Sequence, residues 1–192
     1  MIRIGIIGEI GSGKSFVAKQ FPFPVFNADI EVSKLYKENR KCFKMLKKAL
    51  PGYIISFPVK KEEVSKAILS NKKNLKIINK IIHPEINSKM LNFIKKNKKK
   101  KCVVLDIPLL IENKINKKND ILIYVDAKQN EINKRLKKRS SFNLKMFNKF
   151  KKLQLSREIK KTKSNYIIKN NFNNNFIKRC VKNILGKILS NA

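Results

Sequence analysis

The sequence predicts an α/β protein of three layers, in which a mostly parallel five-stranded sheet lies between helices. Amphipathic segments with helical spacing alternate with short apolar runs, and this alternation is typical of strand–helix–strand units. The chain has 192 residues and is 42% hydrophobic, which is enough for one core domain with insertions. The runs that we expect to form strands are residues 2–7, 25–27, 102–105, 121–125 and 166–168.

A glycine-rich segment directly follows the first predicted strand. Residues 8–15 read Gly-Glu-Ile-Gly-Ser-Gly-Lys-Ser and fit the phosphate-binding pattern G-x-x-x-x-G-K-[ST], the P-loop. Its glycines have no Cβ, so the backbone can turn tightly and point N–H groups at a phosphate. Lys14 can reach the β- and γ-phosphates of a nucleotide, and the Ser15 hydroxyl can bind Mg²⁺. A helix predicted over residues 15–21 completes the strand–loop–helix context of the motif.

The chain is strongly basic, with a formal net charge of +33 at pH 7. A nucleic-acid partner is one explanation, and a general preference for lysine on solvated faces is the other. Arginines are few, and aromatic residues do not alternate with the basic runs as a stacking platform requires. These features favour compositional bias, and no specific nucleic-acid partner is expected.

The sequence also predicts where the protein works. No apolar run is long enough to span a membrane, and the first strand leaves no room for a signal peptide, so no membrane contact is expected. The cysteines are scattered and form no C-x-x-C pair, which suits a reducing compartment. We therefore expect a cytoplasmic protein.

Asp29 directly follows the short predicted strand at residues 25–27. Ligands of open α/β sheets bind beyond the carboxyl ends of the strands, so this carboxylate should share an edge with the P-loop. It could accept the proton of an attacking hydroxyl or help to hold Mg²⁺. It could equally be the N-cap of the next helix, predicted to start near Glu31.

A long helical insert interrupts the alternation between residues 30 and 100. An insert of this length suggests a substrate-binding region rather than a simple crossover. His83-Pro84 lies within it and favours a bend or a helix start, because proline fixes φ and suits the first helical turn. His83 alone favours a structural role, as a histidine that caps or fills a bend, over a functional one. The helices predicted here are residues 30–50, 62–69, 75–82 and 85–94.

Two further predicted strands end in an aspartate. Asp106 follows an apolar run, a pattern that resembles a Walker B acid, although many strands end this way. Asp126 ends the fourth strand, and Gln129 three residues later resembles a capping box, so we interpret Asp126 as structural.

Arg135 and Arg139 are spaced one turn apart on a helix predicted over residues 131–138. A break at residues 140–143 and a second basic helix to about residue 163 would complete a helical hairpin. Such a hairpin suits a lid whose guanidinium groups stabilise a transferred phosphoryl group. An exposed basic hairpin without function is the alternative.

Together these motifs resemble those of the dephospho-CoA kinase family, which is similar to the nucleoside monophosphate kinases. The resemblance covers nearly the whole chain, and its most specific part is the combination of His-Pro and Pro-Leu-Leu-x-Glu at these spacings. The matching segments, in order, are the P-loop, residues 27–29, residues 83–84, residues 108–112, Arg135 with Arg139, Gln154, and residues 166–170.

The resemblance implies ATP-dependent phosphorylation of the ribose 3′-hydroxyl of dephospho-CoA, the last step of coenzyme A synthesis. It implies a P-loop core (1–29, 101–130 and 164–192), a helical CoA-substrate-binding insert (30–100) and a lid (131–163). We expect a monomer or weak homo-oligomer that acts on a small-molecule substrate. Lys14, Asp29, Arg135 and Arg139 match catalytic positions. The ATP-binding set is Gly8, Gly11, Ser12, Gly13, Lys14, Ser15 and Phe16. The substrate-binding set is Asp29, His83, Pro108, Leu109 and Glu112, and the Mg²⁺ ligands are Ser15 and, as a further candidate, Asp106.

Several positions depart from the family pattern by losing an acid. Asn27 replaces the first acid of Asp-Ala-Asp, and Ser140, Asn165 and Lys169 stand where the family has acidic residues. Phe16 stands where a threonine or small residue is usual. Three alternatives stay open. One is a kinase for another nucleotide or small alcohol, the second is a basic P-loop protein that binds nucleic acid, suggested by the net charge, and the third is an inactive homologue, suggested by the lost acids.

Overall fold

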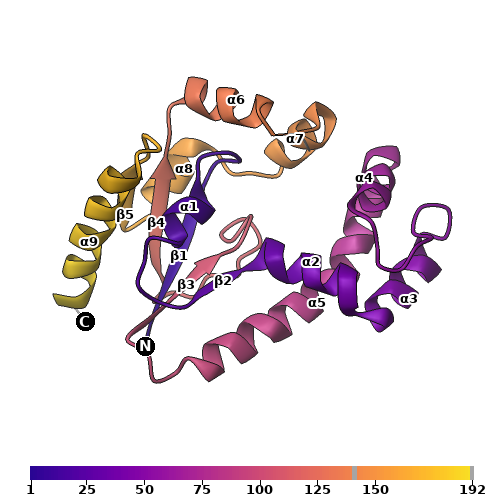
Figure 1. Ribbon diagram of the computed structural model, residues 1–192, viewed down its shortest axis with the longest axis horizontal. Coiled ribbons are helices and arrows are strands. Elements are labelled where there is room, and N and C mark those ends of the chain that lie inside the picture. The colour runs from indigo at the N-terminus through magenta and orange to yellow at the C-terminus, as the bar shows by residue number, and fades with distance from the viewer. Residues whose placement is uncertain (140–141, 191–192) are drawn as a thin grey trace. The chain divides into compact units, whose positions relative to one another are not determined.

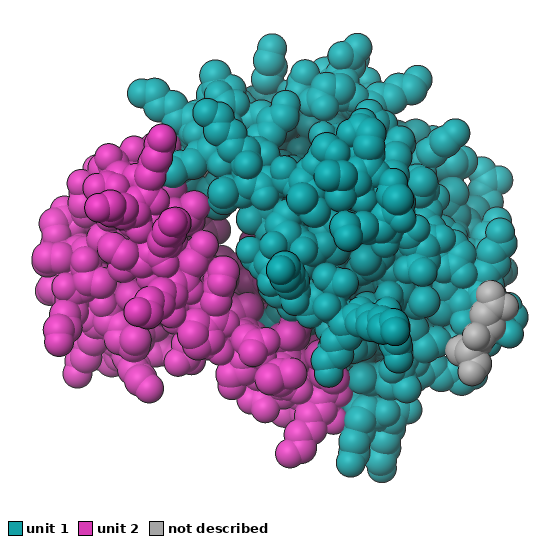
Figure 2. Space-filling model, turned by 180° about the vertical axis from the view of Figure 1, so that it is seen from behind, with its two compact units in different colours: residues 1–27, 97–192 teal, residues 28–96 magenta. Residues whose placement is uncertain are grey.

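The computed structural model describes residues 1–139 and 142–190. The chain forms two compact units, one of residues 1–27 with 97–192 and one of residues 28–96 (Figure 2). The larger unit contains the sheet and the P-loop. The smaller unit is helical.

Within the described residues, the larger unit holds a five-stranded parallel sheet in the order β2-β3-β1-β4-β5 (Figure 1). All five predicted strands are confirmed. Their bounds are β1 Ile2–Gly8, β2 Val25–Asn27, β3 Cys102–Asp106, β4 Ile121–Asp126 and β5 Tyr166–Lys169. Because β1 lies in the middle, the loop that follows it opens at the carboxyl edge of the sheet, where ligands of such folds bind.

The core of this unit explains why its strands read as continuous apolar runs. The residues of β3 are all buried, because helices cover both faces of a parallel sheet. One face packs against α1 (Lys14–Ala18) and α9 (Asn174–Ser190) through Val17, Ile177 and Val181. Burial of this apolar surface stabilises the unit by roughly 25 cal/mol per Å², and it fixes the loop between β1 and α1 at both ends.

The region predicted as a lid contains α6 (Gln129–Lys137), α7 (Leu144–Lys151) and α8 (Arg157–Thr162). The prediction of one helix to residue 163 is wrong, because the chain leaves the helix after α7 and Ser156 begins α8 by accepting a hydrogen bond from the Ile159 N–H. Asn143 caps α7 in the same way through the Met146 N–H. The predicted break begins at residues 140 and 141, which lie outside the described residues.

The smaller unit contains α2 (Ala28–Glu38), α3 (Arg40–Ala49), α4 (Lys61–Ser70) and α5 (Lys72–Lys96). The single helix predicted over residues 30–50 is wrong. Asn39 has extended backbone dihedrals and accepts a hydrogen bond from the Cys42 N–H at 2.8 Å, so it ends one helix and caps the next.

Helix α5 runs through Pro84 without interruption, which corrects the predicted bend at His83-Pro84. A proline inside a helix removes one backbone hydrogen bond and costs about 3 kcal/mol or more. Buried side chains on both sides of the proline, among them Ile78, Ile82 and Met90, hold the two halves in one line. Packing therefore overrides the local preference. Among the described residues, no helix has both the length and the apolar composition that a membrane span needs.

Candidate active site

The P-loop joins β1 to α1 and depends on glycine at two crowded positions. Gly13 has a φ of 91°, and a Cβ there would lie 2.3 Å from Asn170 Nδ2. Gly8 has a φ of 155°, and a Cβ there would lie 2.8 Å from the carbonyl oxygen of Val125. Any larger residue would have to push the loop away from the sheet. The amides of Lys14, Ser15 and Phe16 form the first turn of α1, where N–H groups have no partner within the helix.

The other predicted ATP-binding residues hold the loop in place through buried contacts. Ser12 is fully buried, and its N–H donates to the Glu9 carbonyl at 3.1 Å. Gly11 packs against the side chains of Ile132 and Leu136 on α6. Phe16 is partly buried and packs against the hydrophobic core of this unit. The loop is thus held by the same elements that flank it.

Lys14 lies across the loop to which it belongs. Its Nζ donates to the carbonyl oxygens of Gly8 at 3.2 Å and Glu9 at 2.8 Å. These carbonyls hold the ammonium beside the loop amides, where an anion is attracted by the lysine and by the helix N-terminus together.

Asn170 ties the end of β5 to the P-loop. Its side chain is buried, its Nδ2 donates to the Ser12 carbonyl at 2.7 Å, and its Oδ1 accepts from the Phe172 N–H at 2.8 Å. Both functional groups of the amide are therefore used. Sequence reasoning matched Asn170 to the family without giving it this role.

Arg135 stacks on an aromatic ring beside the loop. Its guanidinium carbon lies 4.2 Å from the centre of the Phe172 ring, and a Cβ on Gly13 would lie 3.0 Å from the same ring. A cation over an aromatic face contributes about 0.5–1 kcal/mol at an exposed site. Arg139 follows the end of α6 and is exposed. Of the two predicted lid arginines, Arg135 is the one that the described contacts place beside the P-loop.

Gln154 bridges the loop from the segment between α7 and α8. Its Oε1 accepts from the Ile10 N–H at 3.3 Å, and its Nε2 donates to the Gly8 carbonyl at 3.4 Å. The Gly8 carbonyl therefore has two donors, Gln154 and Lys14.

Asp106 and Asn27 meet where β3 and β2 end side by side in register. The Asn27 amide donates to the Asp106 carboxylate, which is only 3% exposed. Asn27 thus supplies a donor at a position where an acid would place a second negative charge. This contact explains how the chain tolerates the loss of the first acid of Asp-Ala-Asp.

Asp29 and His83 belong to the helical unit. Asp29 is an exposed residue in the first turn of α2, which begins at Ala28, so the alternative that Asp29 caps a helix starting near Glu31 is wrong. Asp29 comes two residues after Asn27, the last residue of β2. His83 lies on an exposed part of α5, and desolvation lowers its pKa, which favours the neutral imidazole.

The segment after β3 contains the remaining predicted residues. Pro108 is exposed, and Leu109 has a φ of 56°, so the chain turns sharply here. Glu112 points into the unit, where its Oε1 lies 3.1 Å from Lys160 Nζ and accepts from the Leu155 N–H at 3.1 Å. Sequence reasoning missed Lys160, because one lysine among so many carries no signal of burial.

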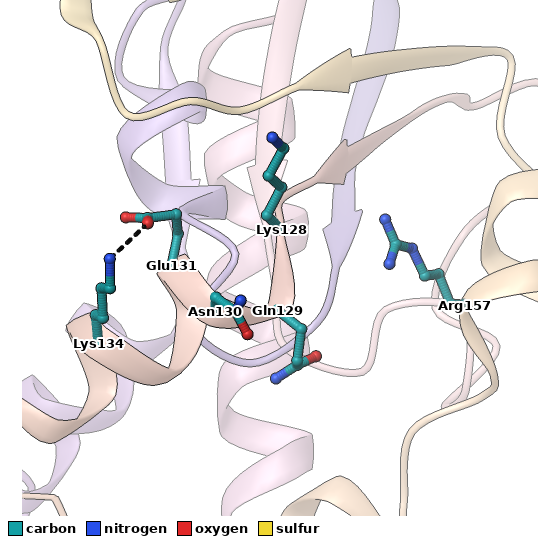
Figure 3. A pocket seen from close by; sticks show the side chains of 6 residues that line it. All are labelled: Lys128, Gln129, Asn130, Glu131, Lys134 and Arg157. Atoms are coloured by element: carbon teal, nitrogen blue, oxygen red, sulfur yellow. Dashed lines mark hydrogen bonds and ion pairs between the residues drawn. The ribbon is translucent and has the colours of Figure 1, made fainter.

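Asp126 pairs with Arg157 and, at 3.0 Å, with Lys161, and it does not cap α6. The capping-box prediction is therefore wrong, because α8 brings two cations to this carboxylate. Arg157 also lines an open pocket of about 550 Å³ at the start of α6 (Figure 3). No residue of the predicted site lines this pocket; those that do are Lys128, Gln129, Asn130, Glu131, Lys134 and Arg157.

Comparison with known proteins agrees with this architecture. The model of the family described as dephospho-CoA kinase matches residues 2–175. Dephospho-CoA kinase of Wolbachia pipientis is 32% identical over 98% of this chain and 99% of its own length.

Solved structures agree in fold. The protein TT1252 of Thermus thermophilus aligns with a TM-score of 0.79 and 25% identity over 97% of each chain. Dephospho-CoA kinase from Campylobacter jejuni aligns with a TM-score of 0.62 and 22% identity over 97% of this chain and 96% of its own. The chain belongs to the dephospho-CoA kinase family.

Proposed function

We propose that this protein transfers the γ-phosphoryl group of ATP to the ribose 3′-hydroxyl of dephospho-CoA, which gives coenzyme A and ADP. The observation that carries the proposal is a complete P-loop, held by Asn170 and Gln154, in a member of the dephospho-CoA kinase family. The ordered P-loop supports ATP binding, which an inactive homologue would share, so phosphoryl transfer to an acceptor separates the two.

The P-loop binds the polyphosphate of ATP. Amides at the start of α1 point toward the phosphates, and Lys14 leaves the carbonyls of its own loop to neutralise the β- and γ-phosphates. Phosphoryl transfer needs little covalent chemistry from the protein, so this positioning and charge neutralisation supply most of the rate enhancement.

The residues beside the loop suit a magnesium ion that arrives with ATP. The Ser15 hydroxyl and the Asp106 carboxylate are hard oxygen ligands, and Mg²⁺ in nucleotide sites usually takes one or two carboxylates, phosphates and water. When bound, Mg²⁺ neutralises charge on the β- and γ-phosphate oxygens. Before Mg²⁺ binds, the hydrogen bond from Asn27 keeps the Asp106 carboxylate oriented.

Asp29 orients the acceptor hydroxyl and accepts its proton as the oxygen attacks the γ-phosphorus. The bond to the β-phosphate oxygen breaks as the new bond forms, and ADP leaves. A carboxylate at this stage contributes mainly by alignment. His83, Pro108 and Leu109 contact the rest of dephospho-CoA. Glu112 belongs to the same predicted set, but its carboxylate is engaged inside the larger unit.

Arg135 and Arg139 belong to the lid. The stack of Arg135 on Phe172 beside Gly13 places a flat cationic and aromatic surface next to the phosphate loop, which suits the adenine base of ATP. Arg139 closes over the transferred phosphoryl group. The enzyme works in the cytoplasm as a monomer or weak homo-oligomer.

An acceptor panel tests the proposal. ADP release is measured with ATP, Mg²⁺ and, in turn, dephospho-CoA, nucleoside monophosphates and shikimate. We expect kcat/KM to be highest for dephospho-CoA by at least about a hundredfold, because smaller acceptors lack the groups that the proposed substrate-binding residues would contact to position the hydroxyl. A higher value for another acceptor would overturn the assignment.

A further inference from the structure

Glu112 and Lys160 form a buried ion pair next to the P-loop. The side chain of Lys160 is 2% exposed and that of Glu112 is 9% exposed, and Lys160 Nζ lies 3.1 Å from Glu112 Oε1. Burying two charges costs several kcal/mol per ion, and an apolar pair in their place is often equally stable or more so. Stability alone therefore does not explain why this pair is there.

The pair fixes the segment that carries Gln154. The same Oε1 of Glu112 accepts a hydrogen bond from the Leu155 N–H, the residue directly after Gln154, and Lys160 lies on the helix that follows this segment. Gln154 in turn contacts the P-loop at the Ile10 N–H and the Gly8 carbonyl. A continuous set of contacts thus runs from the buried pair to the loop.

The Gly8 carbonyl links the Gln154 contact to Lys14. Gly8 is buried, and its oxygen accepts from both Lys14 and Gln154. Leaving a buried acceptor without a donor costs about 1–3 kcal/mol. If Lys14 turns to a phosphate, Gln154 still satisfies this carbonyl, so the lysine moves without that cost.

The space beside the pair excludes direct phosphate binding by Lys160 in this arrangement. The cavity lined by Gly8, Lys14, Glu112, Gln154 and Lys160, among others, has a volume of about 10 Å³. That volume suits about one water molecule and not a phosphate group.

We propose that Glu112 and Lys160 are positioning residues for ATP binding: the pair holds Gln154 against the Gly8 carbonyl and so frees Lys14 for the phosphates. This inference rests on the proposed function only in taking the P-loop ligand to be ATP. It gives Glu112 a role inside the enzyme in place of contact with the acceptor.

The test uses the double variant Glu112→Leu with Lys160→Leu, which removes both charges. We expect a folded protein whose unfolding midpoint stays within about 5 °C of the parent. The Kd for ATP, measured by calorimetry, should rise about tenfold, the scale of one lost hydrogen bond of about 1.4 kcal/mol. KM for dephospho-CoA should stay within about twofold. The single variant Lys160→Arg keeps a cation beside Glu112, so it should retain most of the parental affinity for ATP.

The matched control is the pair Arg3 and Asp120 in the same unit. Asp120 Oδ2 accepts from Arg3 at 3.0 Å and from the Lys117 N–H at 2.9 Å, and both side chains are at most 10% exposed. The double variant Arg3→Leu with Asp120→Leu removes an equivalent pair at the start of β1. It should leave the Kd for ATP unchanged.

A second variant keeps the test decisive if the double variant does not fold. Gln154→Leu removes the amide and leaves the buried pair intact, and the same tenfold rise in Kd is expected. An unchanged Kd for ATP in a folded variant, or an equal rise in the control, overturns the proposal. Because ATP binding is read without turnover, a parent protein that binds ATP but does not phosphorylate dephospho-CoA would refute the proposed function alone.

Discussion

The side-chain amide of Asn27 donates a hydrogen bond to the buried carboxylate of Asp106 across the carboxyl ends of β2 and β3. A carboxylate at position 27 would remove this donor and place a like charge beside a buried acid. The contact gives a physical reason why asparagine is accepted here, and it leads to the first prediction.

Asn27→Asp should lower the free energy of unfolding by about 1–3 kcal/mol at pH 7 in the presence of a chelator, because Asp106 loses a donor and gains a like-charged neighbour. Added Mg²⁺ should recover part of that loss, since a divalent cation can bridge two carboxylates. Urea unfolding with and without Mg²⁺ measures both effects. Equal stability of the variant and the parent in chelator would show that the Asn27 contact contributes nothing.

Asp29→Asn should reduce turnover about a hundredfold or more while ATP still binds, because the acceptor hydroxyl loses the carboxylate that aligns it and accepts its proton. The control is Glu31→Gln on the same helix, whose carboxylate is held by Lys34 and Lys89 at 2.7 and 3.3 Å. The hydrogen bond from Lys34 lowers the pKa of Glu31, so this acid is committed to ion pairs. Steady-state kinetics and ATP calorimetry compare the two. Similar turnover in both variants would remove Asp29 from its role.

Arg135→Ala should raise KM for ATP several-fold and lower kcat, because the stack on Phe172 and a lid charge are lost together. Lys134→Ala is the matched control: it lies on the same helix and its side chain is 70% exposed, but it pairs with Glu131. That variant should keep parental kinetics. If both variants lose activity equally, net charge matters and not the stack.

Asn170→Ala should destabilise the protein by about 1–3 kcal/mol and weaken ATP binding, because the Ser12 carbonyl and the Phe172 N–H both lose a partner. Neighbouring Asn171 is exposed and its Oδ1 accepts from the Asn173 N–H at 3.0 Å, so Asn171→Ala is the control that removes an exposed amide contact. Thermal unfolding and ATP calorimetry measure the two consequences. An Asn170→Ala protein with parental ATP affinity would mean that this tie does not shape the loop.

The sheet and the P-loop were predictable because their signals are local. A buried strand such as β3 needs a continuous apolar run, and the loop needs glycine and lysine at fixed spacing. The helical insert was less predictable. The Asn39 side chain ends one helix and caps the next, although the apolar spacing predicts a continuous helix. Pro84 does not end α5, because packing on both sides of it outweighs the local preference of proline.

The supports of the candidate site were the hardest part to predict. Lys160 is far in sequence from Glu112, and nothing distinguishes it from the exposed lysines around it until the fold buries it. The contact between Asn170 and Ser12 likewise joins the two ends of the chain. Long-range contacts of this kind depend on strand order, which local patterns do not encode.

The most direct measurement is the identity of the product formed from ATP, Mg²⁺ and dephospho-CoA. Mass spectrometry and phosphorus NMR of the reaction should show coenzyme A, with one new phosphate on the ribose 3′-oxygen and one ADP released per transfer. A phosphate at any other position, or ATP binding with no transfer to dephospho-CoA, would contradict the assignment of this protein as a 3′-kinase.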